Sequence, residues 1–478
     1  MLSMKNRKPL LIVLLALTSA LALGTARLSG GDAGTVDLGF DPGDALGTDF
    51  GVQVHSVLVQ PDGRVLVGGG FSISNGAKRD GIMRLDFNGK LDAGFTPRVT
   101  QQGGFWQVNA LALQGAKILV GGRFDSVNGF SRNGLARLNA DGTLDASFNP
   151  KLGPFPEISV VLVQPDKKIL IGGTFSIFDG NRFFSGFARL ASDGSPDATF
   201  DTSAWHGSFV QSAALQSDGK VLVGGWFPSG SDAATNLVRL NKDGSLDAGY
   251  SPTFNLFGTV LGISLQSDGK AVILGEFNNV SGLTRYGCAR LNHDGSVDKG
   301  FEIRDAGADR FSLGGRLQSV AIQADQKILL GGMFSGTGTG WRSCLARFRA
   351  DGTPDPSFTL AEAQSGDLGA LAVQADGKIL IGGGFASYDG LPRRGIVRLN
   401  GSATVPVAPR LDFRKLTATG ALLQLRTEVG VGYVVEHSSD LVSWQELTTF
   451  VSSSDPIELT DDTAPQCPAR FYRARVVP

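Results

Sequence analysis

Hydrophobic and polar positions follow one pattern that is repeated seven times along this chain. Each copy has a short apolar run, a tight turn, a second apolar run ending in Gly-Gly-x-Phe or a close variant, then Arg-Leu, a second turn and Asp-x-x-Phe. A fixed period of about 50 residues indicates one supersecondary unit copied in series. The aromatic residue that ends the second run occurs at Phe71, Phe124, Phe175, Phe227, Phe277, Phe334 and Phe385.

One copy predicts a set of short antiparallel strands. In the first copy an apolar run at 57–60 is followed by Pro-Asp-Gly-Arg at 61–64, and Asp-Gly between apolar runs favours a hairpin because glycine accepts positive φ. Residues 65–69 are apolar without alternation, as in a strand covered on both faces, and the paired glycines indicate a close approach of backbones. Two more strands are expected at 81–85 and 91–95, which gives four per copy.

The two ends of the repeat region indicate how it closes. The seventh copy reaches Arg398 but lacks the Asp-x-x-Phe segment, which occurs instead ahead of the first copy as Val-Asp-Leu-Gly-Phe at residues 36–40. An N-terminal strand that completes the last blade leaves no open sheet edge, whereas an open β-solenoid has no use for this permutation. The chain is therefore predicted to be all-β: a seven-bladed β-propeller closed by an N-terminal strand, with a small C-terminal β-sandwich domain.

The copies also resemble a known family. The strings VLVQPDGRVLVGGGF, ALQSDGKVLVGGWF and AVQADGKILIGGGF, together with LARLNADGTLDASF, resemble the delta-60 repeat of bacterial secreted proteins. The resemblance covers residues 35–401 and implies a β-propeller-like domain in an exported protein, without a known activity. The second and sixth copies depart from the Asp-Gly turn, at 114–117 and 325–326, and neither change affects the predicted fold.

The N-terminus is predicted to be a secretory signal. A basic segment at 5–8 precedes an apolar stretch at 10–17, which is shorter than the roughly 20 residues that a membrane-spanning helix needs. An uncleaved anchor is the alternative. The C-terminal domain is expected to serve adhesion or export, or only to cap the propeller. The predicted segments are a signal peptide at 1–26, the propeller at 35–401, a linker at 402–409 and the β-sandwich-like domain at 410–478.

The composition narrows the classes of partner. The hydrophobic content of 42% with 66 glycines indicates a folded chain with many turns, and a net charge of −1 without a basic stripe excludes nucleic acid as a partner. Cys288, Cys344 and Cys467 form no disulfide framework and are expected to be free thiols. No membrane span is expected after signal cleavage, and the oligomeric state stays open.

An arginine and an aspartate recur in the copies. A catalytic group is needed once, whereas a residue present in every blade has a structural task, so ion pairs or hydrogen bonds between strands are expected. The positions are Arg84, Arg137, Arg189, Arg239, Arg290, Arg347 and Arg398, with Asp92, Asp145, Asp197, Asp247, Asp298 and Asp355.

The other polar residues give no catalytic or metal-binding pattern. The turn at 139–145 offers oxygen ligands, but its glycine comes earlier than in an EF-hand loop, so a hairpin turn is favoured over calcium. The four histidines are scattered, and no Gly-x-Ser-x-Gly motif occurs. No cofactor, metal ligand or catalytic residue is predicted. The irregular polar residues are Asp305, Asp309, Arg310 and His206.

Aromatic residues in the longer loops are the candidate binding residues. The two short turns of each blade should lie on one face of the disc and the longer loops on the other. Exposed aromatic side chains there suit sugar rings or a protein partner, whereas the alternative is that they wedge between blades, because large apolar side chains are usually buried. The candidates are Phe105, Trp106, Trp205, Phe257, Trp341 and Tyr388.

The sequence thus predicts an exported, non-enzymatic binding or scaffold protein, secreted or at the surface of a bacterial cell, which presents a propeller loop face to a glycan or a protein. Two alternatives are kept. One is a secreted polysaccharide-active hydrolase or lyase, which carboxylates or a histidine at the mouth of the central channel would favour. The other is a structural surface-layer component, which would self-assemble.

Overall fold

The computed structural model describes most of the chain, and its regular structure is built from β-strands. The described residues are 11–14, 32–43, 45–46, 51–73, 79–102, 104–178, 180, 183–202, 209–227, 236–254, 258–303, 317–335, 341–359, 362–364, 366–401, 410–417, 420–426, 432–440, 443–451, 456–464 and 469–476.

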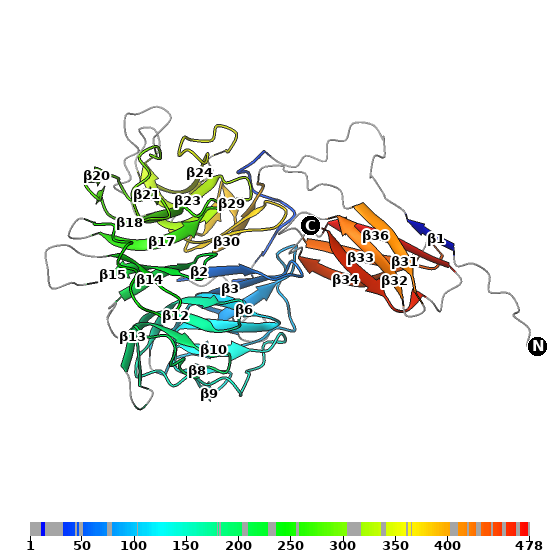
Figure 1. Ribbon diagram of the computed structural model, residues 1–478, viewed down its shortest axis with the longest axis horizontal. Coiled ribbons are helices and arrows are strands. Elements are labelled where there is room, and N and C mark those ends of the chain that lie inside the picture. Colours follow the sequence, from blue (N-terminus) through cyan, green and yellow to red (C-terminus); the bar gives the residue numbers. More distant parts are fainter. Residues whose placement is uncertain are drawn as a thin grey trace, which may run out of the picture.

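Seven antiparallel blades form the larger part of the molecule (Figure 1). The first strands are β2 (Gln53–Val59), β6 (Gln107–Gln114), β11 (Glu157–Val163), β14 (Phe209–Leu215), β17 (Thr259–Leu265), β22 (Leu317–Ile322) and β26 (Leu368–Val373). The second strands are β3 (Val65–Ile73), β7 (Lys117–Arg123), β12 (Ile169–Phe178), β15 (Val221–Trp226), β18 (Ala271–Glu276), β23 (Ile328–Ser335) and β27 (Ile379–Gly383). The third strands are β4 (Arg79–Leu85), β10 (Leu135–Leu138), β13 (Phe183–Leu190), β16 (Leu237–Leu240), β21 (Cys288–Leu291), β24 (Trp341–Phe348) and β30 (Ile396–Leu399).

Short additional strands extend some of the loops. They are β5 (Val99–Thr100), β8 (Ser126–Val127), β9 (Phe130–Ser131), β19 (Asn279–Val280), β20 (Leu283–Thr284), β25 (Glu362–Gln364), β28 (Ser387–Tyr388) and β29 (Leu391–Pro392).

The blades are arranged in a ring. The first strands of neighbouring blades contact one another in a cycle, in which β26 of the seventh blade contacts β2 of the first. Each of the seven blade interfaces has its own buried hydrophobic cluster. At the interface that closes the ring, Leu380 and Ile396 of the seventh blade pack with Val65 and Val67 of the first and with Phe40. The predicted seven-bladed propeller is therefore confirmed.

Residues 34–40 complete the seventh blade, as predicted. Val36 forms an antiparallel bridge with Leu399, and the N–H of Asp37 donates to the carbonyl oxygen of Arg398 at 2.8 Å. These contacts join positions more than 360 residues apart in the chain, so the N-terminal segment closes the ring.

The fourth strand of each blade is shorter than predicted. In the first blade Leu91 pairs with Leu85 through a single bridge, and the chain then turns, with the N–H of Phe95 donating to the carbonyl oxygen of Asp92 at 3.2 Å. The carboxylate of Asp92 accepts from the N–H of Gly94 at 2.9 Å, which is how an aspartate stabilises a turn. The short fourth strand expected at 91–95 is reduced to one bridge, because Asp-x-x-Phe forms a turn that buries the phenylalanine.

The paired glycines are required because neighbouring atoms come close to both of their Cα atoms. A Cβ on Gly68 would lie 2.7 Å from Cγ1 of Val108 in the next blade, and a Cβ on Gly69 would lie 1.9 Å from the carbonyl oxygen of Gln53 in its own blade. Any side chain would therefore displace either the neighbouring blade or the first strand. The second contact recurs, at 1.9 to 2.1 Å, at Gly122, Gly173, Gly225, Gly275 and Gly383.

The repeated arginine and aspartate hold adjacent blades together. Arg84 Nε donates to the carboxylate of Asp92 at 2.8 Å, and Nη1 of the same arginine donates to the carbonyl oxygen of Ala140 in the second blade at 2.6 Å. The guanidinium carbon also lies 4.3 Å from the ring centroid of Phe95. The structural interpretation of these residues is therefore confirmed. Equivalent arginine–aspartate pairs are 137–145, 189–197, 239–247, 290–298 and 347–355.

Arg398 makes the same contacts across the closure of the ring. It donates to the carboxylate of Asp37 at 2.8 Å, and its guanidinium carbon lies 4.7 Å from the ring centroid of Phe40. Its Nη1 donates to the carbonyl oxygen of Phe87 in the first blade at 2.7 Å. The closing segment therefore reproduces the contacts of a continuous blade.

The C-terminal part contains two sheets that share one core (Figure 1). Side chains from both sheets, among them Leu423, Leu425, Tyr433 and Tyr472, pack into one buried cluster. One sheet consists of β31 (Arg410–Leu416), β32 (Ala421–Arg426) and β35 (Ile457–Asp461), and the other contains β33 (Gly432–Ser438), β34 (Gln445–Val451) and β36 (Ala469–Val476).

The described part of the predicted signal segment is β1 (Leu11–Leu14), which pairs in parallel with β36. Among the described residues no helix is long and apolar enough to cross a membrane. The remainder of 1–26 lies outside the described residues, as does the predicted linker at 402–409. Signal cleavage and the exact segment boundaries stay predictions.

The cysteines agree with the expectation where the structure describes them. Cys288 is a buried free thiol in the core between the fifth and sixth blades, and burial raises its pKa to about 12. Cys344 lies in β24, and Cys467 is outside the described residues.

Candidate functional site

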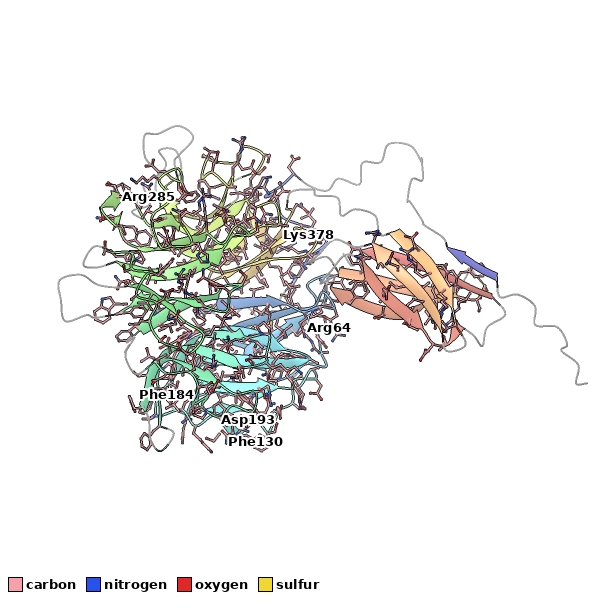
Figure 2. The ribbon with its side chains drawn as sticks, in the orientation of Figure 1. Arg64, Phe130, Phe184, Asp193, Arg285 and Lys378 are labelled. Atoms are coloured by element: carbon pink, nitrogen blue, oxygen red, sulfur yellow. The ribbon has the colours of Figure 1, made fainter. Side chains whose placement is uncertain are left out.

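The antiparallel strand order divides the connections of each blade between two faces. The turns after the first and third strands lie on one face, called the short-turn face, and the other connections lie on the opposite, long-loop face. Figure 2 shows Arg64 and Lys378, which follow short turns, on the side of the propeller nearest the C-terminal domain, and Phe184 and Arg285 on the other side. The predicted division of turns is thus confirmed, and the long-loop face points away from the C-terminal domain.

Two of the predicted aromatic residues line a pocket on the long-loop face. This aromatic pocket has a volume of about 310 Å³ and is lined by Gly51, Val52, Gly70, Phe71, Ser72, Phe105 and Trp106. Phe105 is 62% exposed, whereas Trp106 is half-buried and its indole N–H is buried without a hydrogen-bond partner. The exposed ring of Phe105 offers a ligand a stacking surface at this pocket.

The other predicted binding residues lie elsewhere. Tyr388 is fully buried in the core between the sixth and seventh blades, where its ring centroid lies 5.8 Å from that of Phe385. Its side chain wedges between blades and does not reach a surface ligand, which corrects its inclusion among the binding residues. Trp341 is the first residue of β24, while Trp205 and Phe257 are outside the described residues.

An exposed aromatic pair was missed by the sequence analysis. Phe209 and Trp226 of the fourth blade are 42% and 41% exposed, and their ring centroids are 5.5 Å apart. They are register partners on β14 and β15, so they belong to the repeated strands and not to the loops. A comparison of the copies could have revealed this pair, because the first blade has Gln53 and Gly70 at the equivalent positions.

Each first strand has a β-bulge near its start, at the equivalent position in all seven blades. A bulge re-aims a side chain out of the ladder. The arginine is the same in every blade, whereas the residue at the bulge differs from blade to blade. Such variation is expected where a residue acts in one blade only. The bulged residues are His55, Asn109, Ser159, Gln211, Leu261, Gln318 and Gly369.

Polar residues at this end of the first strands interact from blade to blade around the axis. Glu157 accepts hydrogen bonds from Gln107 Nε2 at 3.0 Å and from Asn109 Nδ2 at 3.4 Å, both in the preceding blade. Asp367 accepts one from Gln318 Nε2 at 3.2 Å. The axial polar cluster is defined as His55, Gln107, Asn109, Glu157, Gln318 and Asp367, all half-buried.

His55 lies within electrostatic range of both carboxylates of the axial polar cluster. Burial lowers its pKa, against the opposing effect of the negative charges of Asp367 and Glu157, so the imidazole is neutral at neutral pH. Its Nε2 is buried without a partner, and so is Oε1 of Gln318. The cluster therefore contains two carboxylates and two unsatisfied polar atoms. The irregular residues named from the sequence, at 206, 305, 309 and 310, are outside the described residues.

The turns considered for calcium use their carboxylates internally. Asp141 accepts hydrogen bonds from the N–H and the hydroxyl of Thr143 at 2.9 and 2.7 Å, and Asn139 donates to the same hydroxyl. These contacts are those of a polar hairpin turn. In the part of the chain that the structure describes, no group of three or more His, Cys, Asp or Glu side chains is placed to hold a metal ion.

Comparisons with known proteins concern the fold. No curated protein matches the chain. PorZ, a bacterial surface component of the type IX secretion system of Porphyromonas gingivalis, is 12% identical over 90% of this chain, with a TM-score of 0.38, and this chain spans 59% of that structure. Sqt1 from Chaetomium thermophilum is 15% identical over 80% of this chain and 93% of its own, with a TM-score of 0.35. At these scores neither likeness carries an argument about function.

A family model gives the identification. A β-propeller domain of unknown function, DUF5122, matches residues 60–95, 117–148, 164–200, 216–250, 266–301, 323–358 and 374–402. The seven matches coincide with the seven copies found in the sequence, and the chain therefore belongs to the DUF5122 β-propeller family.

Proposed function

We propose that this protein is an exported, non-enzymatic binding protein whose long-loop face takes a glycan. The aromatic pocket is the observation that carries the proposal. Phe105 presents an exposed ring in a pocket that Trp106 also lines. Sugar rings stack their apolar faces on aromatic side chains, while their hydroxyls need hydrogen-bonding groups at the edge of the platform.

Such groups are present next to the pocket. Trp106 is followed directly by Gln107 of the axial polar cluster, and Gly70 of the pocket is the register partner of Gln53. The amide side chains of Gln53 and Gln107 are half-buried. A ligand on Phe105 would therefore have amide and carboxylate groups within reach toward the axis.

The N-terminal segment supports the proposed export, because it combines basic residues at 5–8 with an apolar stretch at 10–17. We place the mature protein outside the cell or at its surface. The short-turn face is the side nearest the C-terminal domain, which leaves the long-loop face for the ligand (Figure 2).

Phe105→Ala is expected to weaken glycan binding by about tenfold or more, because a central aromatic anchor contributes at least ~1.4 kcal/mol. A glycan array identifies the ligand, and calorimetry on the purified protein gives the two affinities. Phe130→Ala is the matched control, since Phe130 is 61% exposed in the same blade but does not line the pocket. Equal losses in both variants, or an array without a ligand, would contradict the proposal; a protein ligand in a pull-down would replace the glycan.

One observation favours a second function, catalysis on a polysaccharide. His55, Glu157 and Asp367 are a histidine and two carboxylates near the axis, the groups expected of a hydrolase or lyase in a propeller. Release of reducing or unsaturated sugars from the glycan that binds, abolished by His55→Ala, would establish it. Intact glycan after long incubation supports the binding role.

A further inference from the structure

The axial polar cluster carries the negative charges of Glu157 and Asp367. Glu157 and Asp367 are held by amide groups alone, from Gln107, Asn109 and Gln318. Among the described residues, no lysine or arginine forms an ion pair with either carboxylate, although every repeated aspartate of the blades has an arginine partner. The two negative charges near the axis are therefore not neutralised by the described side chains.

The free hydrogen-bonding capacity of the cluster consists mainly of acceptors. Within the described residues, Oε2 of Glu157 and Oδ1 of Asp367 accept no hydrogen bond, and Oε1 of Gln318 is buried without a partner. The imidazole of His55 is neutral and adds no positive charge to the cluster. Unfilled acceptors with net negative charge favour a ligand that brings several donors and a positive charge, and an ammonium group has three donors and no acceptor.

The cluster adjoins the aromatic pocket at Gln107. A Cβ on Gly70 would lie 3.5 Å from Cζ of Phe105 and 4.0 Å from Cβ of Gln107, which places the pocket wall against the residue that binds Glu157. An oligosaccharide stacked on Phe105 would extend past Gln107 toward Glu157, to which Gln107 donates a hydrogen bond.

We propose that the glycan contains hexosamine units with a free amino group, and that Glu157 and Asp367 bind ammonium groups of the glycan while Phe105 stacks on a sugar ring. This inference rests on the proposed glycan-binding function and adds the class of sugar. Uronic acids and sulfated sugars are disfavoured, because their anionic groups would face the two carboxylates.

The test compares two oligosaccharides of equal length, one of glucosamine and one of N-acetylglucosamine, by calorimetry with the full-length processed protein at a pH at which the amine is protonated. We expect the glucosamine oligomer to bind about tenfold or more tightly, as a charge-assisted hydrogen bond predicts. Glu157→Gln and Asp367→Asn each keep the shape of the side chain and should reduce this ratio several-fold. Asp268→Asn, an exposed carboxylate on the short-turn face, should leave it unchanged.

The outcomes separate the two proposals. Equal affinities for the two oligomers, or a ratio that survives in the Glu157→Gln/Asp367→Asn double variant, overturn the amino-sugar assignment while leaving glycan binding intact. Equal competition by a lysine-rich peptide overturns the assignment to a sugar. If neither oligomer binds, or if Phe105→Ala changes neither affinity, both the assignment and the proposed function fail. Circular dichroism of each variant shows that the propeller is folded.

Discussion

Phe40→Ala is expected to lower the free energy of unfolding by about 3–5 kcal/mol, the usual cost of removing a fully buried phenylalanine side chain. Phe40 is 0% exposed, packs between the seventh and first blades, and lies under the guanidinium of Arg398. Chemical denaturation measures the effect. The loss is large because this side chain belongs to the segment that closes the ring.

Phe95→Ala is the matched control. Phe95 has the equivalent position in the first blade, is also 0% exposed, and lies under Arg84 at 4.3 Å. If the N-terminal segment replaces a covalently continuous strand, the two variants should lose similar stability. A Phe40→Ala variant as stable as the unmodified protein, next to a destabilised Phe95→Ala, would mean that residues 36–40 do not close the ring.

Acid is expected to unfold the propeller steeply between about pH 4 and pH 2, because one aspartate in each blade has a lowered pKa. Burial by itself would raise the pKa of Asp355, but hydrogen bonds from Ser357 and the charges of Arg347 and Lys327 lower it to about 2. The pKa is also lowered at the equivalent Asp37, Asp92, Asp145, Asp197, Asp247 and Asp298.

The direction of this pH effect follows from the linkage between proton binding and folding. A carboxyl whose pKa is lower in the folded state stabilises the fold above its unfolded pKa of about 4, and this contribution is lost as the pH falls through the folded pKa. The free energy of unfolding measured against pH should therefore be flat near neutrality and fall below about pH 4. Asp355→Asn should make the fall shallower. A stability that stays constant down to pH 2 would contradict the network of arginine–aspartate pairs.

The repeated features of the fold could be predicted from the sequence because each copy supports the others. The Asp-Gly turns, the paired glycines and the arginine–aspartate pairs all have one structural cause that acts seven times. The segment at 36–40 was recognised for the same reason, since it is the piece that the seventh copy lacks. The fourth strand was overestimated because Asp-x-x-Phe has the hydrophobic pattern of a strand, while the hydrogen bond from Gly94 to Asp92 makes it a turn.

The candidate site could be predicted only in part. Phe105 and Trp106 could be predicted because aromatic residues in a loop stand out from the polar residues around them. Both line the pocket. Tyr388 shares that description but is buried, because a loop strand carries it into the core between blades. The axial polar cluster was missed, because its residues are far apart in the chain and meet only when the first strands surround the axis.

Closure of the ring is tested most directly by a disulfide between residues 36 and 399. Val36 and Leu399 face each other in a bridge flanked by hydrogen bonds from Asp37 to Arg398 and from Asn400 to Thr35, a geometry that places the two Cα atoms close enough for a disulfide. Leu85 and Leu91 form the same bridge within the first blade and provide the matched pair.

In Val36→Cys/Leu399→Cys, oxidation of the folded protein should form an intramolecular disulfide as completely as in Leu85→Cys/Leu91→Cys. Loss of free thiols measures both pairs, and the large loop closed by the 36–399 disulfide also gives a faster monomer band on a non-reducing gel. Free thiols at 36 and 399 in a folded protein whose 85–91 pair is oxidised would show an open chain of blades and contradict the account.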